Sequence, residues 1–319
     1  MPTIDLDLLQ SGNRRALAKA ITLVESKLDQ HRTQAQHILE QILPSTGKSI
    51  RIGISGIPGV GKSTFIEAFG KFLISEGKKV AVLAVDPSSP VRGGSILGDK
   101  TRMEELSREE NAFIRPSPSE GALGGVAQKT RETMLLCESA GYDVILVETV
   151  GVGQSEYEVA AMVDFFLVLM IPNAGDELQG IKRGIMELAD SLVINKADGE
   201  SINLARRTKT HYQNAFHLIK HGSFWNPRVE TCSALENERI SDIWEMISEY
   251  QQLAIDNNAF YEKRAHQNSQ WMNKLIHEMI ELRLKQSAQV QEKMPSLQQA
   301  VIDNTTTPYN AAKQIVDLI

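Results

Sequence analysis

The sequence predicts an α/β fold in which a mostly parallel central sheet lies between two layers of helices. Short apolar runs alternate along the chain with longer segments that have helical spacing. The runs are apolar at successive positions, which is typical of strands buried on both faces of a parallel sheet. The runs lie at residues 52–54, 80–85, 144–147, 165–171 and 191–194, and the helical segments at 62–76, 123–140, 201–219 and 238–255. This alternation predicts a three-layer α/β sandwich.

One helical extension is expected before this region and one after it. In residues 1–47, apolar side chains recur at helical spacing, and a Pro-Ser-Thr-Gly turn closes the segment. In residues 257–319 the strand signal vanishes, and Pro295 and Pro308 are expected to delimit two short helices after a longer one. The longer helix has an apolar stripe of Trp271, Leu275, Met279 and Leu282. Because a stripe cannot bury itself, it packs on the central domain, residues 48–256, or on a second copy of the chain.

The composition is that of an ordinary globular protein. The chain has 319 residues, of which 42% are hydrophobic and 23% charged. Its net charge of −6 argues against broad nucleic-acid binding, and no apolar run approaches the roughly 20 residues of a membrane-spanning helix. The N-terminus lacks the pattern of a secretory signal, so we expect a cytoplasmic protein. Cys137 and Cys232 are expected to be core thiols without a chemical role.

Residues 56–64 have the G-x-x-x-x-G-K-S/T pattern of a phosphate-binding loop. A strand-like run precedes the loop and a helical segment follows it, which is the context that this pattern requires. Its glycines let backbone N–H groups close around phosphates at the positive end of a helix. Lys62 is expected to bridge the β- and γ-phosphate oxygens, and Ser63 to place its hydroxyl on Mg²⁺. The predicted nucleotide-binding residues here are Gly56, Ile57, Pro58, Gly59, Val60, Gly61, Lys62, Ser63 and Thr64.

A second motif predicts which base is bound. The run at 191–194 leads into Asn195, Lys196 and Asp198 of an N-K-x-D box. The Asp198 carboxylate can accept hydrogen bonds from guanine N1–H and the 2-amino group, whereas adenine would leave it unpaired. We expect Asn195 to brace neighbouring loops or the base edge, and the stem of Lys196 to cover the ring. A short strand at 228–231 is followed by Ser233, Ala234 and Leu235. The backbone of this loop is expected to contact guanine O6.

Three carboxylates lie in loops at or after predicted strand ends, where open α/β sheets bind ligands: Asp86, Asp99 and Glu148. Together with Lys62 they are the candidate catalytic residues. Together with Ser63 they are the candidate Mg²⁺ ligands, since Mg²⁺ prefers oxygen donors. On the sequence alone, Asp99 could equally cap a helical segment at 100–106.

The segment after Glu148 predicts a nucleotide-sensing switch. Gly151 occupies the place of the glycine whose N–H contacts the γ-phosphate and is released on hydrolysis. Val152 stands where Ras-type enzymes have a water-positioning glutamine, so we expect slow intrinsic hydrolysis that a partner accelerates. His211, His217 and His221 could share one helix face, but no cysteine or nearby carboxylate completes a transition-metal site.

Four longer motifs resemble the MeaB/ArgK family of metallochaperone-type P-loop GTPases. They lie at residues 85–90, 93–99, 148–156 and 175–182, and the resemblance spans about residues 50–256. This family is associated with methylmalonyl-CoA mutase, and its human counterpart is the methylmalonic aciduria type A protein. One departure is Asn173, where the family pattern would have glycine.

The resemblance implies the P-loop NTPase fold and a Mg²⁺-dependent hydrolase that binds GTP and GDP. Its partner would be an adenosylcobalamin-dependent acyl-CoA mutase, and methylmalonyl-CoA mutase is the leading candidate. Hydrolysis would gate cofactor delivery to the mutase and protect the mutase from inactivation. The resemblance also implies a homodimer through the C-terminal extension, and roles in magnesium binding and hydrolysis for Asp86, Asp99 and Glu148. It further implies a third switch that responds to the mutase, with Asp176, Glu177, Gln179 and Lys182.

Other functions remain open at this point. A nickel-delivery GTPase would need a Cys/His site near the switches. A transport-linked ATPase or kinase would need an acceptor-activating site and would conflict with Asp198. A non-catalytic, nucleotide-dependent interaction module would conflict with Lys62, Ser63 and the three carboxylates.

Overall fold

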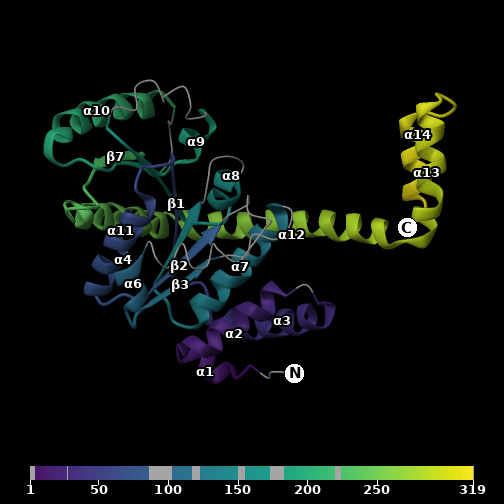
Figure 1. The fold of residues 1–319 in the computed structure, drawn as a ribbon, viewed down its shortest axis with the longest axis horizontal. Coiled ribbons are helices and arrows are strands. Elements are labelled where there is room, and N and C mark those ends of the chain that lie inside the picture. The colour runs from purple at the N-terminus through teal and green to yellow at the C-terminus, as the bar shows by residue number, and fades with distance from the viewer. Residues whose placement is uncertain are drawn as a thin grey trace. The chain divides into compact units, whose positions relative to one another are not determined.

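The computed structural model describes residues 4–26, 28–85, 103–116, 123–149, 155–172, 183–219 and 224–318 (Figure 1). The chain divides into two compact units, Met1–Tyr261 and Glu262–Ile319. The first unit contains the sheet and the N-terminal helices, and the second contains helices alone.

The first unit is built on a sheet of seven strands in the described part of the chain, in the order β3-β2-β4-β1-β5-β6-β7. Every neighbouring pair is parallel, so the carboxyl ends of these strands lie at one edge. The strands are β1 (Ile50–Gly56), β2 (Val80–Val85), β3 (Ala112–Pro116), β4 (Val144–Thr149), β5 (Phe165–Met170), β6 (Ser191–Ile194) and β7 (Arg228–Thr231). The predicted α/β class with a parallel sheet is confirmed. The edge strand β3 was not predicted from the sequence.

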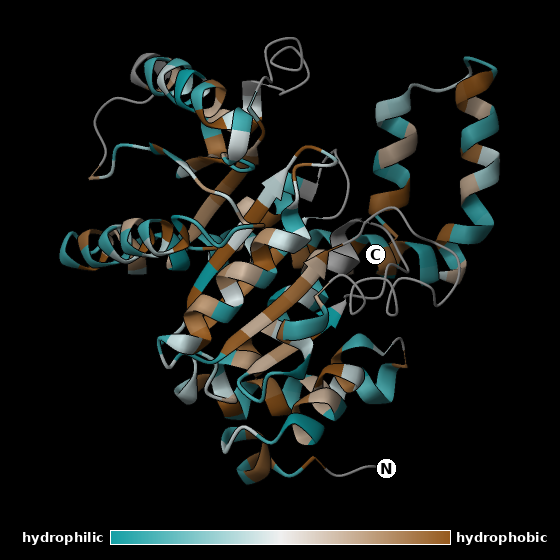
Figure 2. Ribbon diagram, turned by 60° about the vertical axis from the view of Figure 1, so that its left-hand side comes forward, coloured by the Kyte–Doolittle hydropathy of each residue, from teal (hydrophilic) through white to brown (hydrophobic). Residues whose placement is uncertain are grey.

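Helices cover both faces of this sheet. On one face lie α4 (Lys62–Ser75), α6 (Glu104–Arg108) and α11 (Ile240–Asp256), which share an apolar cluster with Ile52, Val144 and Leu146. On the other lie α7 (Leu123–Ser139), α8 (Ser155–Ala160), α9 (Arg183–Leu188) and α10 (Ile202–Ile219), which share a second cluster with Ile145 and Val147. Successive strand residues therefore enter different clusters, as the two-residue period of a strand requires. Figure 2 shows the strands as hydrophobic ribbons between amphipathic helices.

The N-terminal helices extend the second cluster. They are α1 (Leu6–Gln10), α2 (Arg14–Glu25) and α3 (Asp29–Ile42), followed by a 3-10 turn at Leu43–Ser45. Buried Leu17, Ile21 and Ile38 belong to the same apolar cluster as α7. A buried ion pair joins β1 to α7: Arg51 Nε donates to Glu138 Oε1 at 2.8 Å. The Gly47 N–H donates to the other oxygen of Glu138 at 2.8 Å, so this carboxylate joins the N-terminal segment to β1.

The second unit consists of most of α12 (Ala259–Gln286), together with α13 (Ala288–Ile302) and α14 (Pro308–Val316). α13 and α14 pack against one another around an apolar groove lined by Leu297, Val301 and Ile315, among others. Pro308 begins α14 as predicted, but Pro295 lies inside α13, so the prediction that it delimits a helix is wrong. Pro295 has no backbone N–H, so α13 lacks one hydrogen bond at this position.

Candidate nucleotide-binding site

The phosphate loop connects the carboxyl end of β1 to the start of α4, and three glycines determine its path. Gly59 and Gly61 have φ angles of +78° and +87°, a left-handed conformation that glycine adopts without steric cost. A Cβ atom at Gly56 would lie 2.5 Å from the carbonyl oxygen of Leu169 on β5, which no side chain could tolerate. The loop therefore needs glycine at these positions, and it presents the N-terminus of α4 to the same space.

Lys62 is the first residue of α4, and its ammonium group lies across this loop. Its Nζ donates to the carbonyl oxygen of Gly56 at 2.8 Å. Burial lowers the pKa of Lys62, and the carboxylates of Glu148 and Glu156 partly oppose this shift. A bound polyphosphate would supply the negative charge that favours the ammonium form. Ser63 follows Lys62 in the first turn of the same helix.

Asn195 follows β6 and joins the phosphate loop to the loop after β7. The side chain is 2% exposed, and its Nδ2 donates to the carbonyl oxygen of Val60 at 2.8 Å. Its Oδ1 accepts from the N–H of Ala234 at 3.1 Å and from Cys232 Sγ at 3.5 Å. The sequence-based expectation that Asn195 braces neighbouring loops corresponds to these contacts.

Lys196 adds a second link to the phosphate loop. Its backbone has a φ of +58°, and its Nζ donates to the carbonyl oxygen of Gly59 at 2.8 Å. The stem of this side chain therefore runs from the end of β6 to the phosphate loop.

Asp198 and Ser233 form the centre of the candidate base pocket. Ser233 Oγ donates to Asp198 Oδ2 at 2.5 Å, and the N–H of Glu236 donates to Ser233 Oγ at 3.1 Å. Among the described residues no other donor contacts the Asp198 carboxylate, so its second oxygen can accept from a ligand. Leu235 follows Ala234 in this loop and is 73% exposed. The structure thus brings together Asn195, Lys196, Asp198, Ser233, Ala234 and Leu235.

The candidate magnesium ligands are described only in part. Glu148 is a buried residue of β4, and the sheet register places it beside Ile54 of β1 and Ala84 of β2. Its carboxylate is close enough to Lys62 to raise that group's pKa, which puts it near the phosphate loop. The remaining predicted site residues lie outside the described part of the chain: Asp86, Asp99, Gly151, Asp176, Glu177, Gln179 and Lys182, together with Val152 and Asn173.

Two further polar residues of this site were not predicted. Glu156 on α8 is 2% exposed and acts electrostatically on Lys62. Thr149 at the end of β4 donates through Oγ1 to Ser55 Oγ on β1 at 3.0 Å, which links β4 to the strand before the phosphate loop. The one sequence signal for Thr149 or Glu156 is that each lies a few positions after Glu148 in the chain.

Both cysteines are described, whereas His221 and the side chain of His217 lie outside the described residues. Cys137 and Cys232 are both buried free thiols, as predicted, and burial raises the pKa of Cys232 to about 12. Within the described ranges, no group of three His, Cys, Asp or Glu side chains could hold a metal ion. The same part of the chain has no helix that is both long enough and apolar enough to span a bilayer.

A parallel sheet with a glycine loop between β1 and α4, and an Asn-Lys-x-Asp box after β6 that contacts this loop, defines the chain as a P-loop GTPase. The chain belongs to the family of methylmalonyl-CoA mutase-associated GTPases MeaB, whose pattern matches residues 17–289.

Individual relatives agree with this assignment. The chain is 50% identical to a putative GTPase of Caulobacter vibrioides, over 99% of this chain and 98% of that one. It is 48% identical to the GTPase ArgK of Escherichia coli, over 98% and 94% of the two chains. It is also 48% identical to the mitochondrial methylmalonic aciduria type A homolog of Mus musculus, over 95% and 76%. The crystal structure of a protein described as an LAO/AO transport system kinase is similar with a TM-score of 0.79 and 42% identity, covering 98% of this chain and 95% of that one.

Proposed function

We propose that this GTPase is Mg²⁺-dependent and acts as a chaperone and gatekeeper for an adenosylcobalamin-dependent acyl-CoA mutase. Methylmalonyl-CoA mutase is the first candidate partner, and GTP hydrolysis would be coupled both to cofactor delivery and to protection of the mutase. The description of the family, with its mutase association, and the similarity to a methylmalonic aciduria type A homolog support this proposal.

The observation that carries the nucleotide part is the pairing of Ser233 with Asp198. The serine hydroxyl donates to one carboxylate oxygen at 2.5 Å and leaves the other available to a ligand. A carboxylate held in this way can accept from the two donors on the guanine edge, N1–H and the 2-amino group. Adenine has no donors there, so ATP would leave a desolvated carboxylate without partners.

The phosphate part of the proposed mechanism relies on charge and backbone donors. Lys62 would bind the β- and γ-phosphate oxygens. The negative charge of bound phosphate would favour its ammonium form and so oppose the lowering of its pKa by burial. The loop N–H groups and the N-terminus of α4 would stabilise negative charge that develops during phosphoanhydride cleavage.

The donor set suits a hard divalent cation. The described candidates are the Ser63 hydroxyl and the Glu148 carboxylate, both oxygen donors of the kind that Mg²⁺ prefers, and Asp86 and Asp99 would complete the set. When bound, Mg²⁺ would neutralise charge on the transferred phosphate. The position of Glu148 near the end of β4, at the carboxyl edge of the sheet, supports this role.

The homodimer and the partner switch are further parts of the proposal. In the second unit, α12 exposes several large apolar side chains, Met272, Ile276, Met279, Ile280 and Leu282, which are between 44% and 55% exposed. A second copy of the chain would cover them and form a homodimer. Asp176, Glu177, Gln179 and Lys182 would form the switch that responds to the mutase, with Gly151 sensing the γ-phosphate.

The substitution Asp198→Asn tests the base assignment. Asparagine would present an amide donor to the guanine donors, but it would suit the C2 carbonyl of xanthine. We expect GTP affinity to fall by about 100-fold, equivalent to about 2.8 kcal/mol, and xanthosine triphosphate to bind more tightly than in the unchanged protein. Glu200→Gln is the matched control, since it removes an exposed carboxylate from the same loop. Equal binding of ATP and GTP by the unchanged protein would refute the assignment.

The mutase part needs a separate measurement. Purified methylmalonyl-CoA and isobutyryl-CoA mutases would be mixed with the protein in the presence of GDP or a non-hydrolysable GTP analogue. We expect nucleotide-dependent complex formation with one of them, and a change in the rate at which adenosylcobalamin loads that mutase, read by cobalamin absorbance. If neither mutase shows a nucleotide-dependent effect, the chaperone role is wrong while the GTPase activity stands.

A further inference from the structure

Arg239 has an unusual backbone conformation at the end of the candidate base loop. Five non-glycine residues in the described part of the chain have a positive φ, and three of them are asparagines, which tolerate this conformation. The other two are Lys196, in the N-K-x-D box, and Arg239, directly after the base loop, with φ angles of +58° and +60°. For an arginine the left-handed region brings Cβ close to the following carbonyl oxygen, so another interaction must hold it there.

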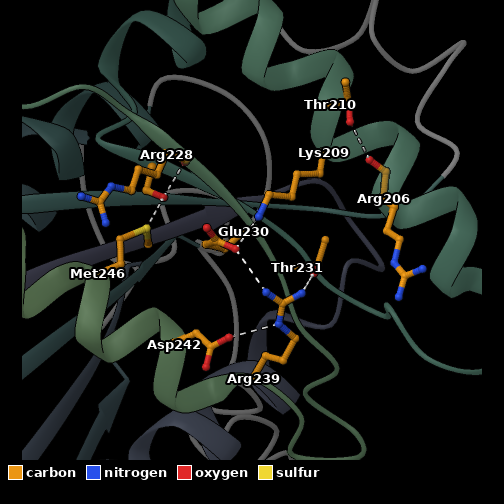
Figure 3. A network of polar contacts seen from close by, with 10 residues as sticks. Arg206, Lys209, Thr210, Arg228, Glu230, Thr231, Arg239, Asp242 and Met246 are labelled. Carbon is orange, nitrogen blue, oxygen red and sulfur yellow. Dashed lines mark hydrogen bonds and ion pairs between the residues drawn. The ribbon is translucent and has the colours of Figure 1, made fainter.

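The guanidinium group of Arg239 supplies that interaction, because it contacts three side chains. Its Nη1 donates to Thr231 Oγ1 at 2.5 Å, its Nε to Asp242 Oδ2 at 3.1 Å, and its Nη2 to Glu230 Oε2 at 3.5 Å. The same oxygen of Glu230 accepts from Lys209 Nζ of α10 at 2.7 Å (Figure 3). One side chain therefore joins the end of β7, the first turn of α11 and, through Glu230, helix α10.

The segment enclosed by these contacts is the base loop itself. Thr231 and Arg239 flank residues 232–238, which include Ser233, Ala234 and Leu235. Within the loop, the N–H of Ser233 donates to the Glu238 carbonyl at 3.1 Å, and the N–H of Glu238 donates back at 3.0 Å. The Thr231–Arg239 contact therefore closes the loop just outside this backbone bridge, and the bridge positions the serine that holds Asp198.

We propose that Arg239 is a positioning residue that holds the base loop in its ligand-ready conformation. This inference rests on the proposed guanine site. The Arg239 side chain is 48% exposed, so each of its ion pairs contributes little by itself. Its effect comes from closing a loop of seven residues, whose ordering would otherwise occur when the nucleotide binds. Arg239 would thus set the affinity and residence time of GTP and GDP alike, because both share the base, and it would leave the phosphate chemistry unaffected.

The test compares substitutions at two arginines of similar exposure. Arg239→Ala and Arg239→Lys remove the fork that reaches three partners, whereas Arg239→Gly also removes the backbone strain. Arg228→Ala is the matched control: Arg228 is 44% exposed and pairs with Glu249 of α11, and this ion pair spans the longer segment 229–248 without contacting Thr231 or Arg239, the two residues that close the base loop directly. Binding and release of fluorescent GTP and GDP would be followed by stopped flow, with kcat measured at saturating GTP and stability by urea unfolding.

We expect Arg239→Ala to weaken GTP and GDP by about fivefold to tenfold, equivalent to about 1–1.4 kcal/mol, mainly through faster release. The kcat at saturation should change by less than about twofold. Neither lysine nor glycine should restore the affinity, since neither can bridge Thr231 and Asp242, and Arg228→Ala should bind nucleotide normally. Unchanged affinity in Arg239→Ala, or an equal loss in Arg228→Ala, would overturn the inference. Those outcomes leave the GTPase assignment intact. The assignment itself would be refuted if the unchanged protein showed no preference for GTP over ATP.

Discussion

Asn195 Nδ2 donates to the carbonyl oxygen of Val60 at 2.8 Å, so the loop expected to bind the base is bonded directly to the loop expected to bind the phosphates. The two residues are 135 positions apart in the chain. The Asn195 side chain also accepts from the Ala234 N–H, which makes it the common partner of three loops at the carboxyl edge of the sheet.

Replacement of Asn195 should therefore destabilise the protein and weaken nucleotide binding together. Asn195→Ala leaves the Val60 carbonyl and the Ala234 N–H without their partner, and a buried unsatisfied group costs about 1–3 kcal/mol. Asn195→Asp keeps the acceptor for Ala234 but has no donor for Val60, so it should bind GTP more weakly than the unchanged protein. Urea unfolding without nucleotide and GTP titration measure the two effects. Normal affinity in both variants would show that the loops keep their places without this side chain.

Lys62 should make the stability of the nucleotide-free protein depend on alkaline pH. Burial lowers its pKa below the ordinary 10.5, so between the lowered pKa and 10.5 the unfolded chain binds more protons than the folded chain. The free energy of unfolding should accordingly rise with pH across that window as the buried ammonium loses its proton. Below the window, the buried charge opposes folding.

The substitution Lys62→Met removes this titration and serves as the reference for it. The free energy of unfolding of the unchanged protein, relative to that of Lys62→Met, should increase as the pH rises toward 10.5. Hydrolysis should be lost in the variant, because the loop no longer supplies a cation to the phosphates. A difference that stays flat with pH would contradict the burial of this ammonium group.

The buried ion pair between Arg51 and Glu138 should be costly to break from one side. Arg51→Met leaves a carboxylate that is 5% exposed without its cation, and the expected loss is about 3–5 kcal/mol. Replacement of both residues, Arg51→Met with Glu138→Leu, should cost less than the sum of the single changes, because no uncompensated charge remains. Denaturant unfolding of the four proteins in a double-mutant cycle gives the coupling. Additive losses would indicate that the pair contributes little beyond packing.

The parts of the site that could be predicted from the sequence are those whose chemistry is local. The glycines, Lys62 and Ser63 of the phosphate loop are adjacent in the chain, and their spacing alone indicates a loop that encloses phosphates. The buried strands were predictable because their side chains face apolar layers on both sides. Strand β3 was missed because it is a short edge strand that ends in Arg115 and Pro116, and so lacks an apolar run at every position.

The contacts that hold the loops together could not be predicted in the same way. Arg239 shows no sequence signal, since a left-handed backbone usually indicates glycine or asparagine, and its partners are known only once β7, α10 and α11 are assembled. Glu156 is similar: it is buried near Lys62 because α8 packs on the sheet, a placement that no local pattern specifies. Helix positions predict which residues are buried, but tertiary packing decides which charges face one another.

The sheet divides the first unit into two separate interiors, and the N-terminal helices belong to just one of them. Leu17 and Ile38 lie in the interior with α7, whereas Val60 and Phe65 of the phosphate-loop side lie in the other. Sequence drift in the first forty or so residues is therefore screened from the phosphate loop by a full layer of strands. Substitutions on the amino-terminal surface should therefore perturb the packing around α7 more than the packing beneath the phosphate loop.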